Sequence, residues 1–477
     1  MHLSQAHPDD ERDPLWMRYR RRAFHPDAEF AALVDRLLAE HGDDEIEIVF
    51  NGDVFDFDAP WVKDGDSSFD EVPPTEEASA AQVKRILADH TIWFSAAARV
   101  VARGHRILFT SGNHDVELCF PAVRAAIRDE IVRLVDLEAA RSASDGSAHD
   151  IHVRAPASIR FRTWFHVTED RIYLEHGSQY DVFNNWRHAM IPLTPARTIH
   201  PNLGKLAFRR TGSRMGYFNP YYEETFYISP VKTVAHFLRH YAFSRRHIAR
   251  TWLFGSLTTL ADIARARAAA RRQDTDHTEH IAHANARAAE ETGATLAVIE
   301  ATHALGARPA ETTMLPIARE LWIDRFVYGA IFFVSTSLAL ALAGAALASI
   351  VAVALLVAIV AYEIAMPKPD IRTYDSAPPE VTRILDLHGV RAMCFGHTHR
   401  PFGIWDERAR FYGNSGSWCP AFLDVMCEKP ILDGRPFLWL TTEGDRVWGG
   451  LHFWRDGAIV VEPGAVRVPA STTELAA

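Results

Sequence analysis

The chain has 477 residues, enough for one elaborated domain or for two to three domains of about 150 residues each. Hydrophobic residues make up 48% and charged residues 23%, which excludes a mainly disordered or collagen-like chain. The 51 Lys and Arg residues against 61 Asp and Glu residues give a net charge of -10, so we expect no nucleic-acid partner. Four scattered cysteines without a C-x-x-C pair argue against a disulfide framework and against a cysteine zinc site.

The first 230 residues alternate strand-like apolar runs with helical periodicity. We expect helices at 30–40 and 82–103, and strands at 45–50 and 106–110. Further on, 159–167 and 171–175 are predicted to form the two strands of a hairpin. This alternation is typical of an α/β domain.

From about 231 to 321 the pattern changes to helix rich in Ala and Arg, with no strand signal. Residues 232–272 contain nine Lys and Arg against one acid, Asp262, and aromatic and aliphatic residues are interleaved among them. This composition predicts a helix that lies on an anionic membrane surface. The alternative is a solvated helix packed on the α/β domain.

An apolar run extends from 326 to 362, which is 37 residues without a charge. One bilayer crossing needs only ~20 residues, so two membrane helices with a bend at Gly344 use the length better. Pro367 and Pro369 are expected to close the second helix. The alternative is a single overlong buried helix.

The α/β pattern then resumes. A helix is predicted at 381–387, strands at 392–395 and 410–412, and a hairpin at 447–461 that turns at 455–457. We therefore divide the chain into an α/β domain whose two parts are 1–230 and 367–465, a basic helical insertion at 231–325, a membrane hairpin at 326–366 and a flexible tail at 466–477.

Four short clusters share one pattern, in which an apolar strand is followed by a Gly-containing turn and by side chains that can bind metal. They are Asn51-Gly52-Asp53-Val54-Phe55-Asp56, Gly112-Asn113-His114-Asp115, His176-Gly177 and Gly396-His397-Thr398-His399. Taken alone, each cluster has a structural explanation, as a turn or a buried core histidine. Their occurrence together, each at a strand end, predicts a binuclear metal site.

These ordered blocks resemble those of the calcineurin-like metallophosphoesterase superfamily, over roughly 1–185 and 380–420. The resemblance extends loosely to UDP-2,3-diacylglucosamine pyrophosphohydrolases, whose second block also begins Gly-Asp-x-Phe. It implies a four-layer α/β/β/α sandwich. Asp53 would bridge two metals, His399 would bind the first metal, and Asn113, His176 and His397 would bind the second.

The resemblance also assigns residues that do not bind metal. His114 looks like the histidine that steadies or protonates the leaving oxygen, with Asp115 orienting its ring. Asp56 is a weaker candidate, either as an acceptor behind a metal ligand or as a turn residue. Arg400 is a weak candidate for binding phosphate.

The opening block departs from the family pattern. His2 matches the histidine of the family's D-x-H block, but the aspartate of that block would fall just before Met1. Three explanations stay open: a start codon set too far downstream, a site that works with His2, Asp53, His399 and water, or a weakly held first metal.

Hydrolysis of a phosphoester needs a strong nucleophile and neutralisation of the phosphoryl charge, and two cations ~3.5–4 Å apart supply both. A metal-bridging hydroxide would attack in line. Carboxylate, amide and imidazole ligands without thiolate favour Mn, Fe or Zn.

The predicted ligands lie on both sides of the apolar run and must meet, so we expect a two-helix transmembrane hairpin or a re-entrant loop rather than a single crossing. Arg325, Lys368 and the basic stretch place both ends on the cytoplasmic side. We therefore expect a membrane-anchored metal-dependent phosphoesterase facing the cytoplasm, with membrane lipid as a partner. Its substrate would be a phosphodiester, phosphomonoester or pyrophosphate, with lipid-linked or nucleotide-containing compounds as candidates. The alternatives are a catalytically weak membrane scaffold and a soluble phosphodiesterase whose apolar run is an interface.

Overall fold

The computed structural model describes residues 1–5, 24–59, 61–63, 66–68, 73–142, 147–194, 197–200, 202–212, 248–272, 277–308, 323–365, 379–419, 421–422, 427–430 and 432–467. Part of the predicted basic stretch (232–247), the prolines and lysine at 367–369 and most of the predicted tail (468–477) lie outside these residues.

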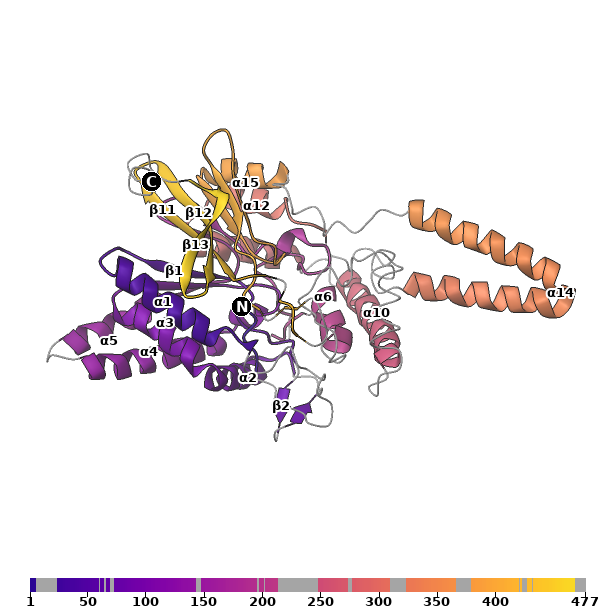
Figure 1. Cartoon of the computed structure of the whole chain (residues 1–477), viewed down its shortest axis with the longest axis horizontal. Coiled ribbons are helices and arrows are strands. Elements are labelled where there is room, and N and C mark those ends of the chain that lie inside the picture. The colour runs from indigo at the N-terminus through magenta and orange to yellow at the C-terminus, as the bar shows by residue number, and fades with distance from the viewer. Residues whose placement is uncertain are drawn as a thin grey trace.

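The protein is a mixed α/β structure (Figure 1). One sheet is parallel, in the order β1-β4-β5, and a second is mixed, in the order β6-β7-β8-β10-β9. A third, antiparallel sheet has the order β11-β12-β13, and β2 and β3 form a small hairpin. The strands are β1 (Glu47–Asn51), β2 (Trp61–Lys63), β3 (Asp66–Ser68), β4 (Arg106–Thr110), β5 (Ile159–Arg162), β6 (His166–Val167), β7 (Ile172–Leu174), β8 (Ala392–Phe395), β9 (Phe402–Trp405), β10 (Phe411–Asn414), β11 (Arg435–Glu443), β12 (Arg446–Arg455) and β13 (Ala458–Arg467).

Helices precede, connect and extend from these sheets. They are α1 (Asp27–His41), α2 (Glu76–Asp89), α3 (Thr91–Ala102), α4 (Pro121–Ser142), α5 (Ser147–Ser158), α6 (Leu203–Ala207), α10 (Ile248–Arg272), α11 (His277–Thr292), α12 (Leu296–His303), α14 (Ile323–Ala365) and α15 (Pro379–His388). Short helical turns lie at η3 (Val116–Cys119), η4 (Ser178–Tyr180) and η5 (Phe208–Gly212).

The side chains of the two central sheets alternate between separate hydrophobic clusters. In β4, Phe109 packs with helices α1 to α4, whereas its neighbour Leu108 lies in a cluster with Leu174 of β7 and Cys394 of β8. On the other face of β8, Met393 packs with residues of α11, α12 and α15. Because successive strand residues point to opposite faces, both sheets are buried on both sides. The inner faces of the two sheets pack against each other.

The structure differs from prediction at two points in the first half of the chain. The helix expected at 82–103 is two helices, because the backbone turns at His90, whose buried imidazole contacts Asp27 and the carbonyl of Ser4. The strand expected at 159–167 is also divided: β5 joins the first sheet and β6 pairs with β7. The residues between β5 and β6 are not part of a strand, because Trp164 is buried in the hydrophobic cluster of the second sheet, where its indole N–H donates to Glu175.

The second half of the chain agrees more closely with prediction. The helix at α15, the strands β8 and β10 and the β12–β13 hairpin lie where they were expected. β13 continues to Arg467, so the first two residues assigned to the tail belong to a strand. α11 and α12, within the expected insertion, pack against the second sheet.

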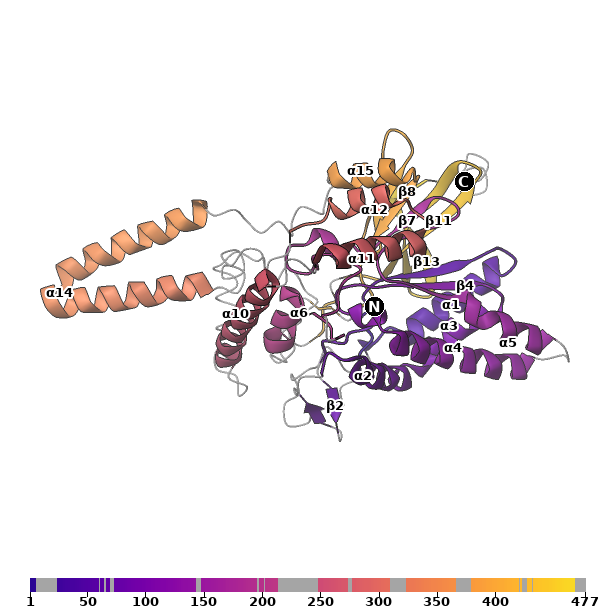
Figure 2. The same cartoon turned by 180° about the vertical axis from the view of Figure 1, so that it is seen from behind.

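The apolar run forms a long helical hairpin. α14 bends at Gly344, where φ is 82° and ψ is -176°, and its two arms lie side by side and project away from the body (Figures 1 and 2). At the base, Arg325 contacts Glu363 at 3.1 Å, and Tyr362 donates to Asp324 at 3.0 Å. The predicted bend at Gly344 is confirmed.

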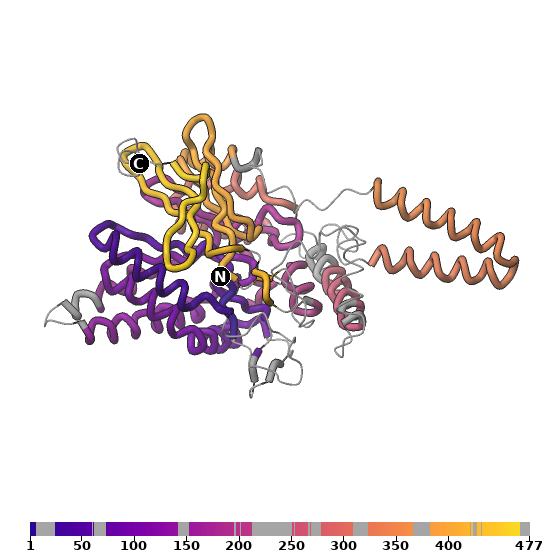
Figure 3. The backbone as a smooth tube through the Cα atoms, in the orientation of Figure 1, coloured from indigo at the N-terminus to yellow at the C-terminus, as the bar shows by residue number. Residues whose placement is uncertain are grey.

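Within the described residues α14 is the helix that is long and apolar enough to cross a membrane, judged by length and composition. Only 6% of its most apolar window is buried, so the alternative of one overlong buried helix is wrong. Figure 3 shows the backbone of the hairpin standing clear of the rest of the chain.

We predict that the contact between the two sheets contributes strongly to stability. Leu108→Ala, at a side chain with 0% exposure, should lower the free energy of unfolding by about 2–5 kcal/mol, because it leaves a cavity that the sheets cannot fill. Leu137→Ala on α4, where the leucine is 46% exposed, is the matched control and should change it by less than about 0.5 kcal/mol. Urea unfolding in detergent, followed by tryptophan fluorescence, measures both. Equal losses would mean that Leu108 is not in a packed interior.

Candidate metal centre

The predicted clusters meet at one edge of the two central sheets. β1 and β4 are parallel, and so are β7 and β8, so the carboxyl ends within each pair lie at the same edge. The turns after these four strands carry the predicted ligands.

Asn51, the last residue of β1, connects the two sheets at this edge. Its side-chain amide donates to the carbonyl of Glu175, just after β7, at 2.8 Å and to the carbonyl of Cys394, within β8, at 3.0 Å. Its own carbonyl lies 2.9 Å from Nδ1 of His176. Since that contact assigns the proton to Nδ1, the Nε2 lone pair of His176 is directed to the site.

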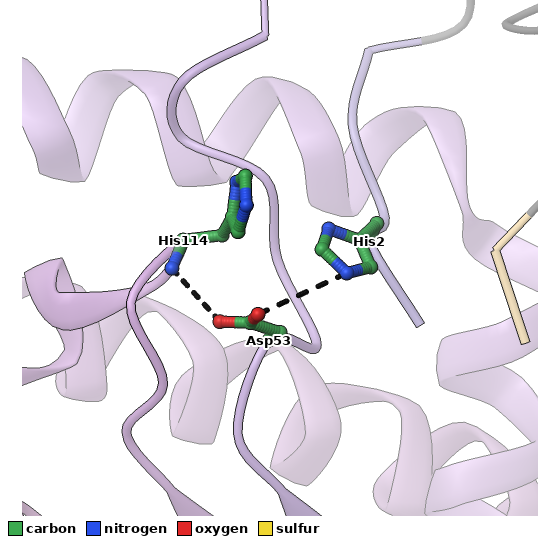
Figure 4. A group of neighbouring side chains, drawn as sticks. All are labelled: His2, Asp53 and His114. Carbon is green, nitrogen blue, oxygen red and sulfur yellow. Dashed lines mark hydrogen bonds and ion pairs between the residues drawn. The ribbon is translucent and has the colours of Figure 1, made fainter. Parts of the chain in front are cut away.

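The buried carboxylate of Asp53 lies at the centre of the site. Its Oδ2 is 3.1 Å from Nε2 of His176 and 3.8 Å from Nε2 of His2. Its Oδ1 accepts a hydrogen bond from the backbone N–H of His114 at 2.8 Å. Figure 4 shows the carboxylate between His2 and His114. One oxygen of this carboxylate, Oδ2, therefore lies near the imidazoles of both His176 and His2, and the other, Oδ1, accepts from the backbone.

On one side of Asp53 the amide oxygen of Asn113 joins two imidazoles. Its Oδ1 is 3.1 Å from Nε2 of His176 and 3.0 Å from Nδ1 of His397. Asp53, His176 and His397 each offer a ligand atom within 4.8 Å of the others. The predicted ligands of the second metal are thus brought together.

On the other side, Nε2 of His2 lies 3.1 Å from Nε2 of His399. The opening segment is held there by backbone hydrogen bonds from His2 to Asp53 and from Leu3 to Val54. The amino terminus accordingly lies in the middle of the body (Figure 3). His2 and His399, both predicted as ligands of the first metal, are therefore brought next to each other.

The turns that carry these side chains are tightly constrained. A Cβ at Gly52 would lie 2.4 Å from Nδ1 of His176, and one at Gly112 would lie 2.2 Å from Oδ1 of Asp53. Asp53, His397 and His399 have φ values of 51°, 66° and 58°, in the left-handed region that non-glycine residues rarely adopt. Backbone strain of this kind is concentrated at functional sites.

Burial and the neighbouring charges determine the protonation of the site. Burial alone would raise the pKa of Asp53, but His176 and His114 outweigh it and hold that pKa well below its usual value. Burial lowers the pKa of His399 to about 3 and lowers the pKa of His2 well below the ordinary value. The charged carboxylate of Asp53 beside neutral His2 and His399 is the protonation state that metal binding requires. Burial alone would lower the pKa of His176, but Asp53 outweighs it and raises that pKa, so this imidazole has to release its proton when it binds a metal.

Asp115 does not have the role predicted for it. Its two oxygens accept hydrogen bonds from the backbone N–H groups of Gly112 and Val54 at 2.6 and 2.8 Å, so it ties two site turns together. The ring of His114 instead has Nδ1 3.4 Å from Asp56 and 3.6 Å from Asp58. The prediction that Asp115 orients the ring of His114 is therefore corrected. Both oxygens of Asp115 already accept hydrogen bonds from the backbone of the two turns.

Burial favours a neutral His114, but the carboxylates of Asp53, Asp56 and Asp58 outweigh it and raise the pKa of His114 to about 9. Asp56 also accepts the backbone N–H of Asp58 at 3.0 Å. Asp56 therefore has the turn role weighed for it, and its side chain also faces His114; its role behind a metal ligand stays a prediction. Arg400 is half-buried, and its assignment to phosphate stays a prediction.

Asp181 is absent from the predicted set. Its Oδ2 lies 2.9 Å from Nε2 of His397, and it also accepts from Asn184 at 2.6 Å. A carboxylate behind a histidine ligand fixes the orientation and tautomer of the ring. The only sequence signal is its position five residues after His176, which packing explains equally well.

A second group missing from the prediction lies beside His114. Buried Lys205 contacts Asp58 at 3.0 Å and Glu117 at 3.1 Å, and Arg209 pairs with the same two acids. The ring of Phe208 packs edge-on against His114, with centroids 5.1 Å apart. The segment from α6 to η5 thus forms one wall of the site.

Three groups of described side chains could hold a metal ion. His2–Asp53–His114 and Asp53–His176–His397 share the Asp53 carboxylate, and the third is Asp56–Asp58–His114. Oxygen and imidazole nitrogen donors suit Mn, Fe or Zn.

Comparison of the chain with family models, with curated proteins and with solved structures finds no match. The resemblance to metallophosphoesterases therefore rests on the motifs.

We predict that Asp181→Asn weakens metal binding by about 10–100-fold, because His397 loses the carboxylate that orients its ring. Asp386→Asn, at a carboxylate on α15 that pairs with Arg410 on the surface, is the matched control. Calorimetric titration with Mn²⁺ measures both variants. An unchanged affinity in Asp181→Asn would show that Asp181 does not support a ligand.

Proposed function

We propose that this protein is a membrane-anchored, binuclear metal-dependent phosphoesterase. The observation that carries the proposal is the Asp53 carboxylate, whose Oδ2 lies 3.1 Å from Nε2 of His176 and 3.8 Å from Nε2 of His2. A shared carboxylate with oxygen and nitrogen donors on both flanks is the arrangement that a pair of hydrolytic cations needs.

We further propose that the fold is the four-layer α/β/β/α sandwich of the metallophosphoesterases. Three hydrophobic clusters support this: helices α1 to α4 pack on the first sheet, the two sheets pack on each other, and α11, α12 and α15 pack on the second. The turns after β1, β4, β7 and β8 carry the site, in the order in which that superfamily has its blocks.

Each site residue then has a defined task. Asp53 would be shared, His2 and His399 would complete one ion site, and Asn113, His176 and His397 would complete the other. When bound, two cations would lower the pKa of water and neutralise charge on the phosphoryl group. His114, with Asp56 and Asp58 facing its Nδ1, would supply the proton that the leaving oxygen takes up.

The hairpin would act as the anchor. Gly344 divides the 43-residue helix into two arms, each about 31 Å long at ~1.5 Å per residue, which matches a hydrocarbon core of about 30 Å. Asp53 precedes the hairpin and His397 follows it, so the hairpin must enter and leave on the same side. The positive-inside tendency makes that side cytoplasmic.

The substrate would carry a phosphodiester, phosphomonoester or pyrophosphate bond. A site held at a lipid surface gains from the high local concentration of substrates in that surface. Lipid-linked compounds are therefore favoured over soluble nucleotides as substrates.

We expect the full-length protein with added Mn²⁺ to hydrolyse bis(p-nitrophenyl) phosphate. His114→Ala should lower the rate by about 10²–10⁴-fold through loss of the proton donor. Asp53→Asn should reduce it to background, because the shared carboxylate is lost. His152→Ala and Asp136→Asn change an exposed pair on α5 and α4 and serve as matched controls with unchanged rates. Equal rates in all five proteins would end the enzymatic assignment.

The anchor is tested separately from catalysis. After washing with alkaline carbonate, the full-length protein should remain in the membrane pellet, because the exposed hairpin loses its apolar contacts with lipid when it is extracted. Recovery in the supernatant would favour a soluble enzyme whose apolar hairpin is an interface.

A further inference from the structure

Helix α10 exposes apolar residues and buries polar ones. Phe254 and Leu257 are 55% and 46% exposed, whereas Ser256 and Thr259 of the same helix have 0% exposure. A surface helix of a soluble protein has the opposite pattern. The outer face of α10 therefore lacks an apolar partner within the described residues.

The exposed residues form one continuous face. At ~100° per residue, Phe254, Leu257, Ala261, Ala264 and Ala268 lie on the same side of the helix, and all five are exposed. Arg250 is exposed at the amino-terminal end of this face, and Arg265 is exposed along one side of it. The guanidinium of Arg250 lies 5.6 Å from the ring of Phe254. The face is apolar along most of its length, with one arginine at its amino-terminal end and one at its side.

The opposite side of α10 is fixed to the wall of the site. A Cβ at Gly255 would lie 2.5 Å from Cγ2 of Thr211, so the helix approaches η5 closely. Asp262 pairs with Arg210, and Ile263 packs with Leu203 of α6. This close packing orients the apolar face away from the body.

The base of the hairpin belongs to the same packing. Ile323, the first residue of α14, lies in the hydrophobic cluster that contains Leu260 and Ile263 of α10. In Figures 1 and 2, α6 is on the body side of α10, and the hairpin projects on the other side. The helix also runs across the direction of the hairpin arms. The face opposite α6 is therefore turned toward the side on which the hairpin would enter lipid.

We propose that α10 is an interfacial helix whose exposed face binds the headgroup layer of an anionic bilayer, the bilayer that the hairpin enters. The inference rests on the proposed membrane anchoring and specifies the lipid. Its basis is continuity with the hairpin base and a helix charge of five arginines against one acid, Asp262, which is itself paired. Helices with an exposed apolar face and neighbouring basic residues bind anionic lipid surfaces in this way.

This placement gives the candidate site a fixed position relative to the membrane. α10 packs on η5, which begins with Phe208, and Phe208 contacts His114. The wall of the site that carries Phe208 would lie one helix, α10, away from the lipid surface.

The test uses the full-length protein with Cys119 and Cys427, the two cysteines that are not fully buried, replaced by serine. Single cysteines introduced by Leu257→Cys on α10, Leu342→Cys on the hairpin and Leu137→Cys on α4 receive an environment-sensitive fluorophore. All three leucines are exposed, at 46%, 77% and 46%. The proteins are reconstituted in vesicles of phosphatidylcholine mixed with phosphatidylglycerol, with or without lipid that carries a quencher.

We expect lipid-borne quenching at positions 257 and 342 and none at 137. Quenching at 257 should fall several-fold in phosphatidylcholine alone and also after Arg250→Glu with Arg265→Glu, while quenching at 342 is unchanged. Quenching at 342 but not at 257 would overturn the α10 proposal and leave the anchor intact, whereas quenching at neither would overturn both. Energy transfer between labelled copies at 257 without lipid quenching would identify a second chain as the partner and also overturn the proposal.

Discussion

The side-chain amide of Asn51 joins the two central sheets at the edge where the candidate ligands gather. With one donor group it contacts a carbonyl after β7 and a carbonyl in β8, and its own carbonyl fixes the tautomer of His176. Two sheets that pack only through aliphatic side chains could slide relative to one another. The hydrogen bonds of Asn51 fix the position of one sheet relative to the other at the carboxyl ends of the strands. A shift of about an ångström there would separate Asp53 from His176.

A second constraint concerns the order of the chain. The segments that carry Asp53, Asn113 and His176 precede the hairpin, and the segment that carries His397 follows it. Because these residues meet within a few ångströms, the two ends of α14 must lie on the same side of any membrane that the helix enters. The contacts of Arg325 with Glu363 and of Tyr362 with Asp324 close the hairpin at its base. The chain order of the centre and the closed base of the hairpin are thus compatible.

The sequence predicts the parts of this structure that depend on local pattern. The turns at Asp53, Asn113 and His397 follow short apolar strands, and the bend at Gly344 follows from the length of the apolar run. Features that depend on distant partners escape this reasoning. His90 interrupts a helix through contacts with Asp27 and Ser4, and the carboxylate of Asp181 faces His397, more than two hundred residues away. Nothing in the neighbouring residues of these positions encodes those contacts.

The left-handed backbone at Asp53, His397 and His399 has a consequence for how such a centre persists. Each of these conformations costs a side chain of order 1–3 kcal/mol, and glycine would adopt it without that penalty. The backbone conformation alone would therefore favour glycine at these three positions. Glycine would relieve the strain, but it would also remove the hydrogen bond of Asp53 to the backbone of His114 and the contact of His397 with Asp181. The side chains that strain these turns are thus the same ones that hold the turns to their neighbours.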